Sequence, residues 1–235
     1  MISKQLCFFS MVFYILSMSY GFAKNPLTKS RLTKLSGEDV LPIDHKSTWD
    51  HRYNKKHYIY GKRPAQFLAE NFDFIKPGSL VLDMGMGEGR NAVFLAQKGH
   101  KVTGIDISSV AIKKANLLAR EKNVKIKTVV GTLNKYIIKP NSFDVIICFY
   151  FVSRELNQKM LSWLKPGGII IYEAHTLNEY SKFKRVPAKL REEKEYYLRP
   201  QELLSMFSNL EILKFEEPTH EKVFRSSIIA RKKHL

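Results

Sequence analysis

A glycine-rich turn at residues 83–89 is the feature that most limits what this chain can fold into. A short apolar run, residues 80–82, precedes it and reads as a buried strand. An amphipathic helical pattern follows the turn, and residues 101–105 read as a second strand that ends at the carboxylate of Asp106. The stretch therefore predicts a β-α-β unit, the building block of a parallel sheet.

The turn has the chemistry of a nucleotide-binding loop. Gly85, Gly87 and Gly89 let the backbone approach a ligand, and the helix start behind them presents unpaired N–H groups. Asp106 follows the glycine turn by roughly 20 residues, which is the spacing at which an acid binds ribose hydroxyls in nucleotide-binding β-α-β units. The glycines do not fit the dinucleotide pattern G-x-G-x-x-G, and the anionic Asp83 suits a methionine ammonium group better than a pyrophosphate. A glycine turn without a ligand is the alternative interpretation.

Strand and helix patterns alternate through the rest of the chain. Further strands are expected at residues 126–130, 143–149 and 169–174, and further helices at residues 64–71, 108–121, 153–164 and 200–206. Two β-type runs close the chain, at residues 210–216 and 224–231. We therefore expect an α/β fold: a doubly wound, mostly parallel seven-stranded sheet with a C-terminal antiparallel hairpin and helices on both faces.

Ligands of such sheets bind beyond the carboxyl ends of the strands. The expected strands bring together at that edge Asp83, Asp106, Thr132, Cys148 and His175. Residues 48–76 are rich in aromatic side chains and read either as a lid over this edge or as a helix packed on the sheet. Residues 176–198 show no period and read as a long loop.

The glycine turn resembles motif I of the class I S-adenosylmethionine-dependent methyltransferases, whose sheet is Rossmann-like. The similarity is closest to the tellurite-resistance-type (TehB-like) small-molecule branch and covers about residues 48–232. The residues that carry it are Gly87–Ala92 (GEGRNA), Lys165–Gly168 (KPGG) and Glu173–Thr176 (EAHT), with Trp49, Arg52, Tyr53, Tyr60, Gly61, Pro64, Phe67 and Leu68 ahead of them. The resemblance implies S-adenosyl-L-methionine as the cofactor.

The resemblance also implies a cofactor role for individual residues. Asp83, Gly85 and Gly87 would line the methionine and ribose end of the cofactor. Asp106 would bind the ribose hydroxyls, and Ile107 would cover one face of the adenine. The complete set of predicted cofactor-binding residues is Asp83, Gly85, Gly87, Gly89, Asp106, Ile107, Thr132, Leu133 and Cys148.

The adenine edge departs from the family pattern. Many relatives carry an aspartate where this chain has Thr132, and that carboxylate accepts from the adenine amino group. Thr132 can still accept through its hydroxyl and Leu133 through its backbone carbonyl. We therefore expect Thr132 to contribute modestly to cofactor affinity.

Methyl transfer from a sulfonium needs alignment and a dry pocket more than covalent help. His175, just past the fifth expected strand, is the candidate base for an acceptor that carries a proton. A structural histidine that is hydrogen-bonded in the loop is the alternative. The candidates for orienting the acceptor are Tyr53, Tyr60, Tyr172 and Arg199. No metal site is predicted.

Residues 1–23 do not belong to the predicted domain. Their apolar run ends in small residues, the pattern of a secretory signal peptide. Basic residues follow the run, which instead favours an uncleaved membrane anchor with the domain in the cytoplasm, where S-adenosylmethionine is available. A later translation start is a third interpretation. Residues 24–47 read as a basic linker and residues 48–235 as the methyltransferase domain.

The chain has 235 residues and a formal net charge of +17, from 39 Lys and Arg against 22 Asp and Glu. This charge fits either a solvated surface or an acidic partner such as nucleic acid or an anionic membrane. Residues 148–151 read Cys-Phe-Tyr-Phe, without the Asn/Asp-Pro-Pro-aromatic turn of enzymes that methylate base amino groups. Cys148 follows an isoleucine, not the proline usual before a pyrimidine-methylating cysteine, and its alternative is a buried apolar role.

We therefore expect a small-molecule methyl acceptor, and the resemblance implies a thiol or a chalcogen oxyanion. An RNA or protein methyltransferase is one alternative, and a non-catalytic cofactor-fold protein that binds an acidic partner is another. Contact with a membrane would be made through residues 1–23.

Overall fold

The computed structural model describes residues 45–177, 196–218 and 224–234. The predictions for residues 1–23, for most of the linker at 24–47 and for most of the loop at 176–198 lie outside these ranges. A helix that the sequence analysis did not predict, α2 (His45–Tyr53), opens the described chain, so the end of the expected linker is helical. Within the described ranges, no helix combines the length and the hydrophobicity that crossing a membrane requires.

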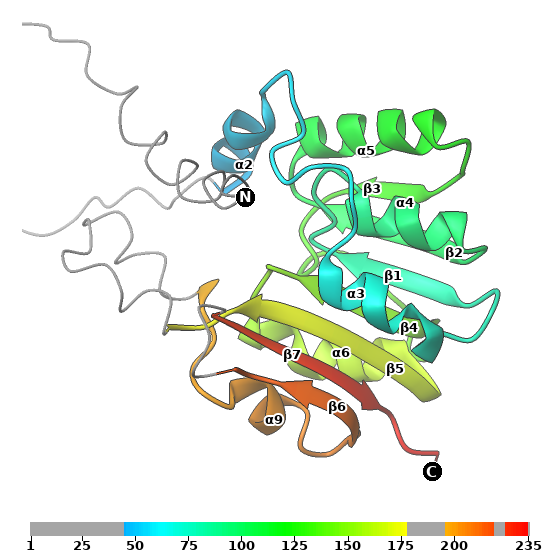
Figure 1. Cartoon of the computed structure of the whole chain (residues 1–235), viewed down its shortest axis with the longest axis vertical. Coiled ribbons are helices and arrows are strands. Elements are labelled where there is room, and N and C mark those ends of the chain that lie inside the picture. The colour runs from blue at the N-terminus through cyan, green and yellow to red at the C-terminus, as the bar shows by residue number, and fades with distance from the viewer. Residues whose placement is uncertain (1–44, 178–195, 219–223, 235) are drawn as a thin grey trace, which may run out of the picture. The chain divides into compact units, whose positions relative to one another are not determined.

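A seven-stranded sheet forms the centre of the domain (Figure 1). Its strands are β1 (Leu80–Met84), β2 (Lys101–Asp106), β3 (Lys127–Val130), β4 (Phe143–Phe149), β5 (Leu164–His175), β6 (Glu211–Glu216) and β7 (Arg225–Arg231). They lie in the order β3-β2-β1-β4-β5-β7-β6. Strands β1 to β5 run parallel, and β7 is antiparallel to both β5 and β6. The predicted α/β fold with its C-terminal antiparallel pair is confirmed.

Helices cover both faces of the sheet (Figure 1). One face carries α3 (Gln66–Asn71), α4 (Arg90–Gln97) and α5 (Ser109–Glu121), and the other carries α6 (Asn157–Trp163) and α9 (Glu202–Met206). Alternate residues of β4 enter the two cores: Val145 and Ile147 pack under the first group of helices, Ile146 and Cys148 under the second. Burial on both faces fixes the register of the strand and hence the positions of the residues at its end.

Two boundaries differ from the prediction. Strand β5 starts at Leu164, well before the expected 169–174, because it includes Lys165–Gly168. The backbone of Gly167 is left-handed, with a φ of 72°, and its N–H donates to the Lys232 carbonyl at 2.8 Å. A glycine allows this irregularity near the start of the strand, and the preceding helix α6 ends at Trp163, close to the predicted residue 164. The helix predicted at 153–164 begins as a 3₁₀ turn, η3 (Arg154–Leu156), before α6.

Candidate cofactor and acceptor site

The glycine turn joins β1 to α4 at the point where the strand order reverses between β1 and β4. Gly85, Gly87 and Gly89 all have left-handed backbones, with φ of 65°, 52° and 83°. The Gly85 N–H donates to the Ile105 carbonyl at 2.9 Å, so the turn folds back over the end of β2. A side chain at Gly89 would lie 2.7 Å from Cβ of Ala115, because α4 and α5 pack closely there. Open α/β sheets bind ligands at this position, where the strand order reverses.

Asp106, at the end of β2, ties the turn to α5. Its carboxylate accepts from the N–H of Gly87 at 2.8 Å and from the N–H of Ser108 at 2.8 Å. The residue is 8% exposed, and this burial raises its pKa although both backbone hydrogen bonds act in the opposite direction. Each carboxylate oxygen has two lone pairs, so Asp106 keeps the capacity to accept further hydrogen bonds from a sugar.

Asp83, near the end of β1, has a buried oxygen without a partner. The residue is 2% exposed, and its Oδ2 finds no hydrogen-bond partner among the residues that the structure describes. Burial, and then the negative charge of Asp106, raise the pKa of Asp83 to about 8. Buried polar atoms are normally satisfied, so the orphan oxygen beneath the glycine turn is suited to a cationic ligand group.

Two aromatic side chains stand against the turn. A side chain at Gly87 would lie 2.9 Å from Oη of Tyr53, and one at Gly85 would lie 2.9 Å from the ring of Phe151. Tyr53, predicted to orient the acceptor, is 6% exposed and meets the ring of Tyr60 edge-on at 6.3 Å. Tyr60 is 39% exposed. The structure therefore brings Tyr53 and Tyr60 together beside the turn, while the sequence analysis did not identify Phe151.

Helix α2 is fixed over this region by Asp50, which the sequence analysis missed. The Asp50 carboxylate accepts from Oγ of Ser108 at 2.6 Å and from the N–H of Val110 at 3.2 Å, at the start of α5. Hydrogen bonds from Lys46 and then from Ser108 hold the pKa of Asp50 far below its usual range. No local sequence pattern points to this contact, since α2 and α5 are far apart in the chain.

The Glu-Gly-Arg-Asn stretch holds the chain that follows α2. Glu88 accepts from the Ile59 N–H at 2.7 Å. Asn91 accepts from the Ala65 N–H at 2.8 Å, and Arg90 donates to the Tyr60 carbonyl at 3.2 Å. These three side chains therefore anchor residues 59–65 against the glycine turn. The Glu-Gly-Arg-Asn stretch thus has a structural role.

The residues predicted at the adenine edge lie at the ends of β2 and β3. The Gly131 N–H donates to the Asp106 carbonyl at 2.9 Å, which brings the two strand ends together. Ile107 and Thr132 are half-buried, and Leu133 is buried. The Thr132 carbonyl accepts from the Lys135 N–H at 3.0 Å. The Thr132 hydroxyl is the acceptor that a substitution to alanine would remove.

Cys148 and Tyr172 belong to the core beneath this edge. Both are buried, and both donate to the carbonyl of Phe151, Cys148 from Sγ at 3.0 Å and Tyr172 from Oη at 2.6 Å. Burial raises the pKa of the Cys148 thiol, which gives it no nucleophilic character. Tyr172 is fully buried and supports the Phe151 turn, whereas the sequence analysis expected it to orient the acceptor.

His175 ends β5 and lies next to a residue that the sequence analysis passed over. Its ring centroid is 4.9 Å from that of Tyr150, the residue directly after β4, and 6.3 Å from that of Tyr197. The guanidinium of Arg90 lies 5.5 Å from the centroid of the Tyr150 ring. Tyr150 therefore stands between the start of α4 and the end of β5.

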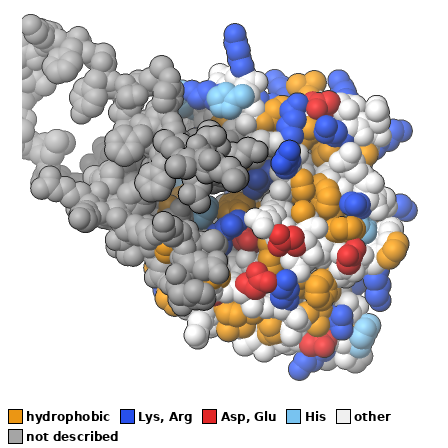
Figure 2. All heavy atoms as spheres, viewed as in Figure 1, with side chains coloured by type: hydrophobic (Ala, Val, Ile, Leu, Met, Phe, Trp, Pro, Cys, Tyr) orange, Lys and Arg blue, Asp and Glu red, His pale blue; other side chains and the backbone are white. Residues whose placement is uncertain are grey.

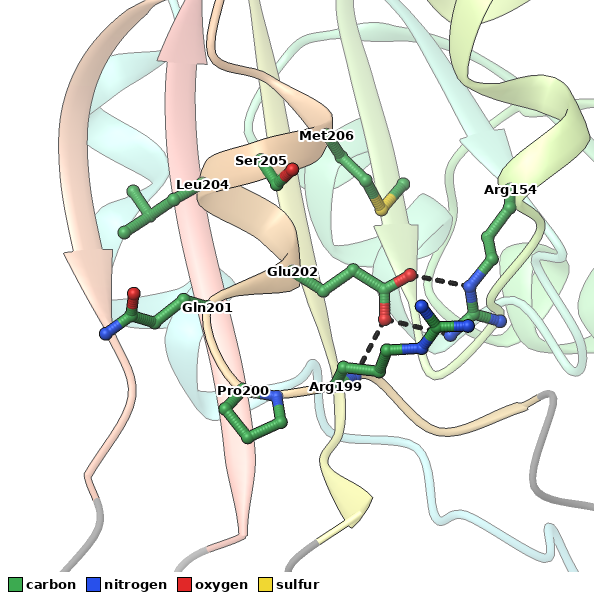
Figure 3. Close-up of a pocket in the computed structure, with 8 residues that line it drawn as sticks. All are labelled: Arg154, Arg199, Pro200, Gln201, Glu202, Leu204, Ser205 and Met206. Atoms are coloured by element: carbon green, nitrogen blue, oxygen red, sulfur yellow. Dashed lines mark hydrogen bonds and ion pairs between the residues drawn. The ribbon is translucent and has the colours of Figure 1, made fainter.

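Arg199 lies beside α9 at a surface pocket (Figure 3). Figure 3 shows Glu202 facing both arginines of this pocket: it accepts from Nε of Arg154 at 2.5 Å and from the backbone N–H of Arg199 at 2.7 Å. The described lining residues come from η3, the 199–201 segment and α9, and the glycine turn is not among them. Neither Tyr53 nor Tyr60 is among the described residues that line this pocket.

In the part of the chain that the structure describes, no group of three or more His, Cys, Asp or Glu side chains could hold a metal ion. On the face seen in Figure 2, lysine and arginine side chains are scattered among apolar and acidic ones.

Several known methyltransferases are similar to this chain. Residues 81–168 match the model of a methyltransferase domain. A ubiquinone biosynthesis O-methyltransferase of Vibrio cholerae is 26% identical over 144 residues, which are 55% of this chain and 59% of that protein. Phosphoethanolamine N-methyltransferase 3 of Arabidopsis thaliana is 34% identical over 135 residues, 52% of this chain and 28% of that protein. The chain thus matches little more than half the length of the first of these relatives.

Among solved structures, TehB from Haemophilus influenzae has the same fold. The TM-score is 0.58 at 23% identity, over 80% of this chain and 67% of that one.

Proposed function

We propose, from the class I S-adenosylmethionine-dependent methyltransferase fold of this chain and the methyltransferase domain at residues 81–168, that the protein transfers a methyl group to a small-molecule acceptor. S-adenosylmethionine is the methyl donor that this family implies. Its sulfonium supplies an already activated methyl group, so the protein has to align the acceptor and exclude water.

The observation that carries the proposal is the pair of buried carboxylates under the glycine turn. Asp83 offers a carboxylate oxygen that lacks a partner among the described residues, which suits the cationic methionine end of the donor. Asp106 is held by the turn itself and keeps lone pairs for the ribose hydroxyls. Gly85 and Gly87 have left-handed backbones and no Cβ atom, and the Phe151 ring and the Tyr53 hydroxyl stand where their Cβ atoms would lie.

The acceptor is proposed to bind at the carboxyl ends of β4 and β5, where Tyr150 and His175 meet. Tyr53 and Tyr60 would close this space from the side of α2. The named relatives methylate oxygen and nitrogen in small molecules, which supports a small acceptor, and the resemblance to the tellurite-resistance branch extends the candidates to thiols and chalcogen oxyanions.

The same proposal covers the chain ahead of the domain. Residues 1–23 would serve as a signal peptide or membrane anchor and residues 24–47 as a basic linker, with the domain at 48–235 facing the cytoplasmic supply of donor. Protease treatment of spheroplasts tests this part. A domain that stays protected supports it, and a cleaved protein found outside the inner membrane contradicts it.

Methyl transfer from labelled S-adenosylmethionine to a panel of thiols, selenite, tellurite and RNA tests the main proposal. Transfer to a small acceptor supports it. Transfer to RNA alone, with the salt dependence of phosphate contacts, would favour a nucleic-acid enzyme instead. A protein that binds no donor would be a non-catalytic member of the fold.

A further inference from the structure

Tyr150 has an unusual backbone conformation at the point of the sheet where the strand order reverses. It follows β4 directly, opposite the end of β1, where the strand order reverses. Its φ is 59°, a left-handed value that is strained for an aromatic residue. The Tyr150 N–H donates to the Glu173 carbonyl at 2.8 Å, so β5 holds the strained conformation in place. Strain of this kind is retained mainly where it positions a functional side chain.

The hydroxyl of Tyr150 is held between a buried acid and an arginine. Its Oη donates to Oε1 of Glu173 at 2.6 Å, and Arg225 donates to the same Oη at 3.0 Å. The other oxygen of Glu173 accepts from Oγ of Ser227 at 2.8 Å. Glu173 is 3% exposed, so this carboxylate meets its partners inside the protein.

These contacts fix the direction of the hydroxyl proton. An arginine can only donate, so the proton of Tyr150 must point to Glu173. The lone pair of Oη that remains can then only accept a hydrogen bond. A group bound beside Tyr150 would therefore be a proton donor, such as a hydroxyl or a thiol, and a fully deprotonated oxyanion would meet no donor at this atom.

The surroundings place Tyr150 next to the proposed donor site. The guanidinium of Arg90, the residue after Gly89 of the turn, lies 5.5 Å from the centroid of the Tyr150 ring, and the centroid of the His175 ring lies 4.9 Å from it. Burial, and then the charge of Glu173, raise the pKa of Tyr150 to about 12, so the phenol keeps its proton near neutral pH. A phenol in this state can pass a proton on but cannot act as a standing phenolate.

We propose, on the basis of the proposed methyltransferase function, that Tyr150 is a catalytic residue that takes the acceptor's proton and passes its own to Glu173, and that the acceptor is a neutral hydroxyl or thiol. The acceptor's O–H or S–H bond breaks while its lone pair forms the bond to the methyl carbon. The bond from that carbon to the donor sulfur breaks, and the electron pair stays on sulfur. The acceptor proton moves to Oη of Tyr150, and the Tyr150 proton moves to Glu173, which later releases it to water.

Three probe acceptors separate this role from a structural one. 2-Mercaptoethanol and catechol are protonated at neutral pH and need a proton acceptor, whereas 4-nitrothiophenol is already ionised. In the full-length protein, Tyr150→Phe and Glu173→Gln should lower kcat for the two protonated probes by about 100-fold, a usual effect of losing general base catalysis. Transfer to 4-nitrothiophenol should change by less than about threefold, and calorimetry should give an unchanged Kd for S-adenosylmethionine.

Tyr172→Phe is the matched control, since it removes a buried tyrosine hydroxyl outside the Glu173 pair. It should affect all three probes by one factor. Equal losses for all probes in Tyr150→Phe, or a wild-type protein that methylates only the ionised thiol, would overturn the inference. A wild type that binds the donor and methylates none of the probes would overturn the acceptor class. Failure to bind the donor at all would instead refute the proposed function.

Discussion

The carboxylate of Asp106 accepts a hydrogen bond of 2.8 Å from the backbone N–H of Gly87, the middle glycine of the turn. The same carboxylate accepts from the N–H of Ser108, whose Oγ in turn donates to Asp50 of α2 at 2.6 Å. One chain of hydrogen bonds thus runs from the glycine turn to helix α2. A substitution at either end of this series of hydrogen bonds should therefore alter the structure at the other end.

The raised pKa of Asp83 makes donor binding depend on pH. Below about pH 8 the carboxyl is largely protonated, and a cationic donor favours its ionised form, so binding releases a proton. The affinity for S-adenosylmethionine should therefore rise as the pH increases from 6 to 8, by up to about tenfold per pH unit, and level off above. Calorimetry in buffers of different ionisation enthalpy measures both effects. Asp83→Asn should bind more weakly and lose this part of the dependence; equal affinities of the wild type at pH 6 and 9 would contradict the assignment.

The stability of the protein without donor should move in the opposite direction. The folded chain holds a proton on Asp83 up to about pH 8, whereas an unfolded aspartate releases it near pH 4. The contribution of this group to stability is therefore complete below about pH 4 and is lost as the pH rises through 8. Urea unfolding at pH 6 and 8 should show a larger decrease for the wild type than for Asp83→Asn. Parallel decreases in the two proteins would show that Asp83 is not the group involved.

Asp50→Ala should loosen α2. The substitution removes the acceptor for Ser108 Oγ and the Val110 N–H at the start of α5, a loss comparable with that of a helix N-cap, about 1 kcal/mol. Hydrogen exchange should then become faster in α2 and in the first turn of α5, and the donor should dissociate faster. Asp73→Ala, at an exposed aspartate of the 3₁₀ helix η2 (Phe72–Phe74), is the control and should leave both rates unchanged. Unaltered exchange in α2 of the Asp50 variant would mean that this contact does not hold the helix.

Gly89→Ala compared with Gly99→Ala separates backbone strain from crowding. Both glycines are left-handed, with φ of 83° and 87°, but a methyl group at Gly89 would lie 2.7 Å from Cβ of Ala115, whereas Gly99 has nothing within 4 Å. Strain alone should cost Gly99→Ala about 1–2 kcal/mol. Crowding between α4 and α5 should add about 1–3 kcal/mol for Gly89→Ala. Equal free energies of unfolding for the two variants would contradict the close packing of these helices.

Much of the fold followed from local pattern. Apolar runs predicted the buried strands. A helix cap was expected at Ser108 or Ser109, and Ser108 provides it by accepting from the Ala111 N–H at 3.1 Å. The helix before Lys165–Gly168 ends close to the predicted residue 164, but the start of β5 was placed too late, because a Lys-Pro-Gly-Gly sequence breaks a helix equally well whether a loop or an irregular strand follows.

Parts of the candidate site could be predicted from residue type and position along the strands. The glycines and the acids at strand ends, Asp83 and Asp106, could be placed because parallel strands end at one edge. Asp50 and the Tyr150–Glu173 pair could not, because their roles depend on contacts between segments far apart in the chain. The strained φ of Tyr150 also has no signature in the sequence.

Calorimetric titration of S-adenosylmethionine into the wild type and Asp106→Ala tests whether the donor binds at the end of β2. We expect measurable binding by the wild type, none by Asp106→Ala, and a modest loss of affinity for Thr132→Ala, which keeps its backbone carbonyl. Circular dichroism should confirm that the variants are folded. Wild-type affinity in a folded Asp106→Ala protein would contradict the assignment of the donor site to the end of β2.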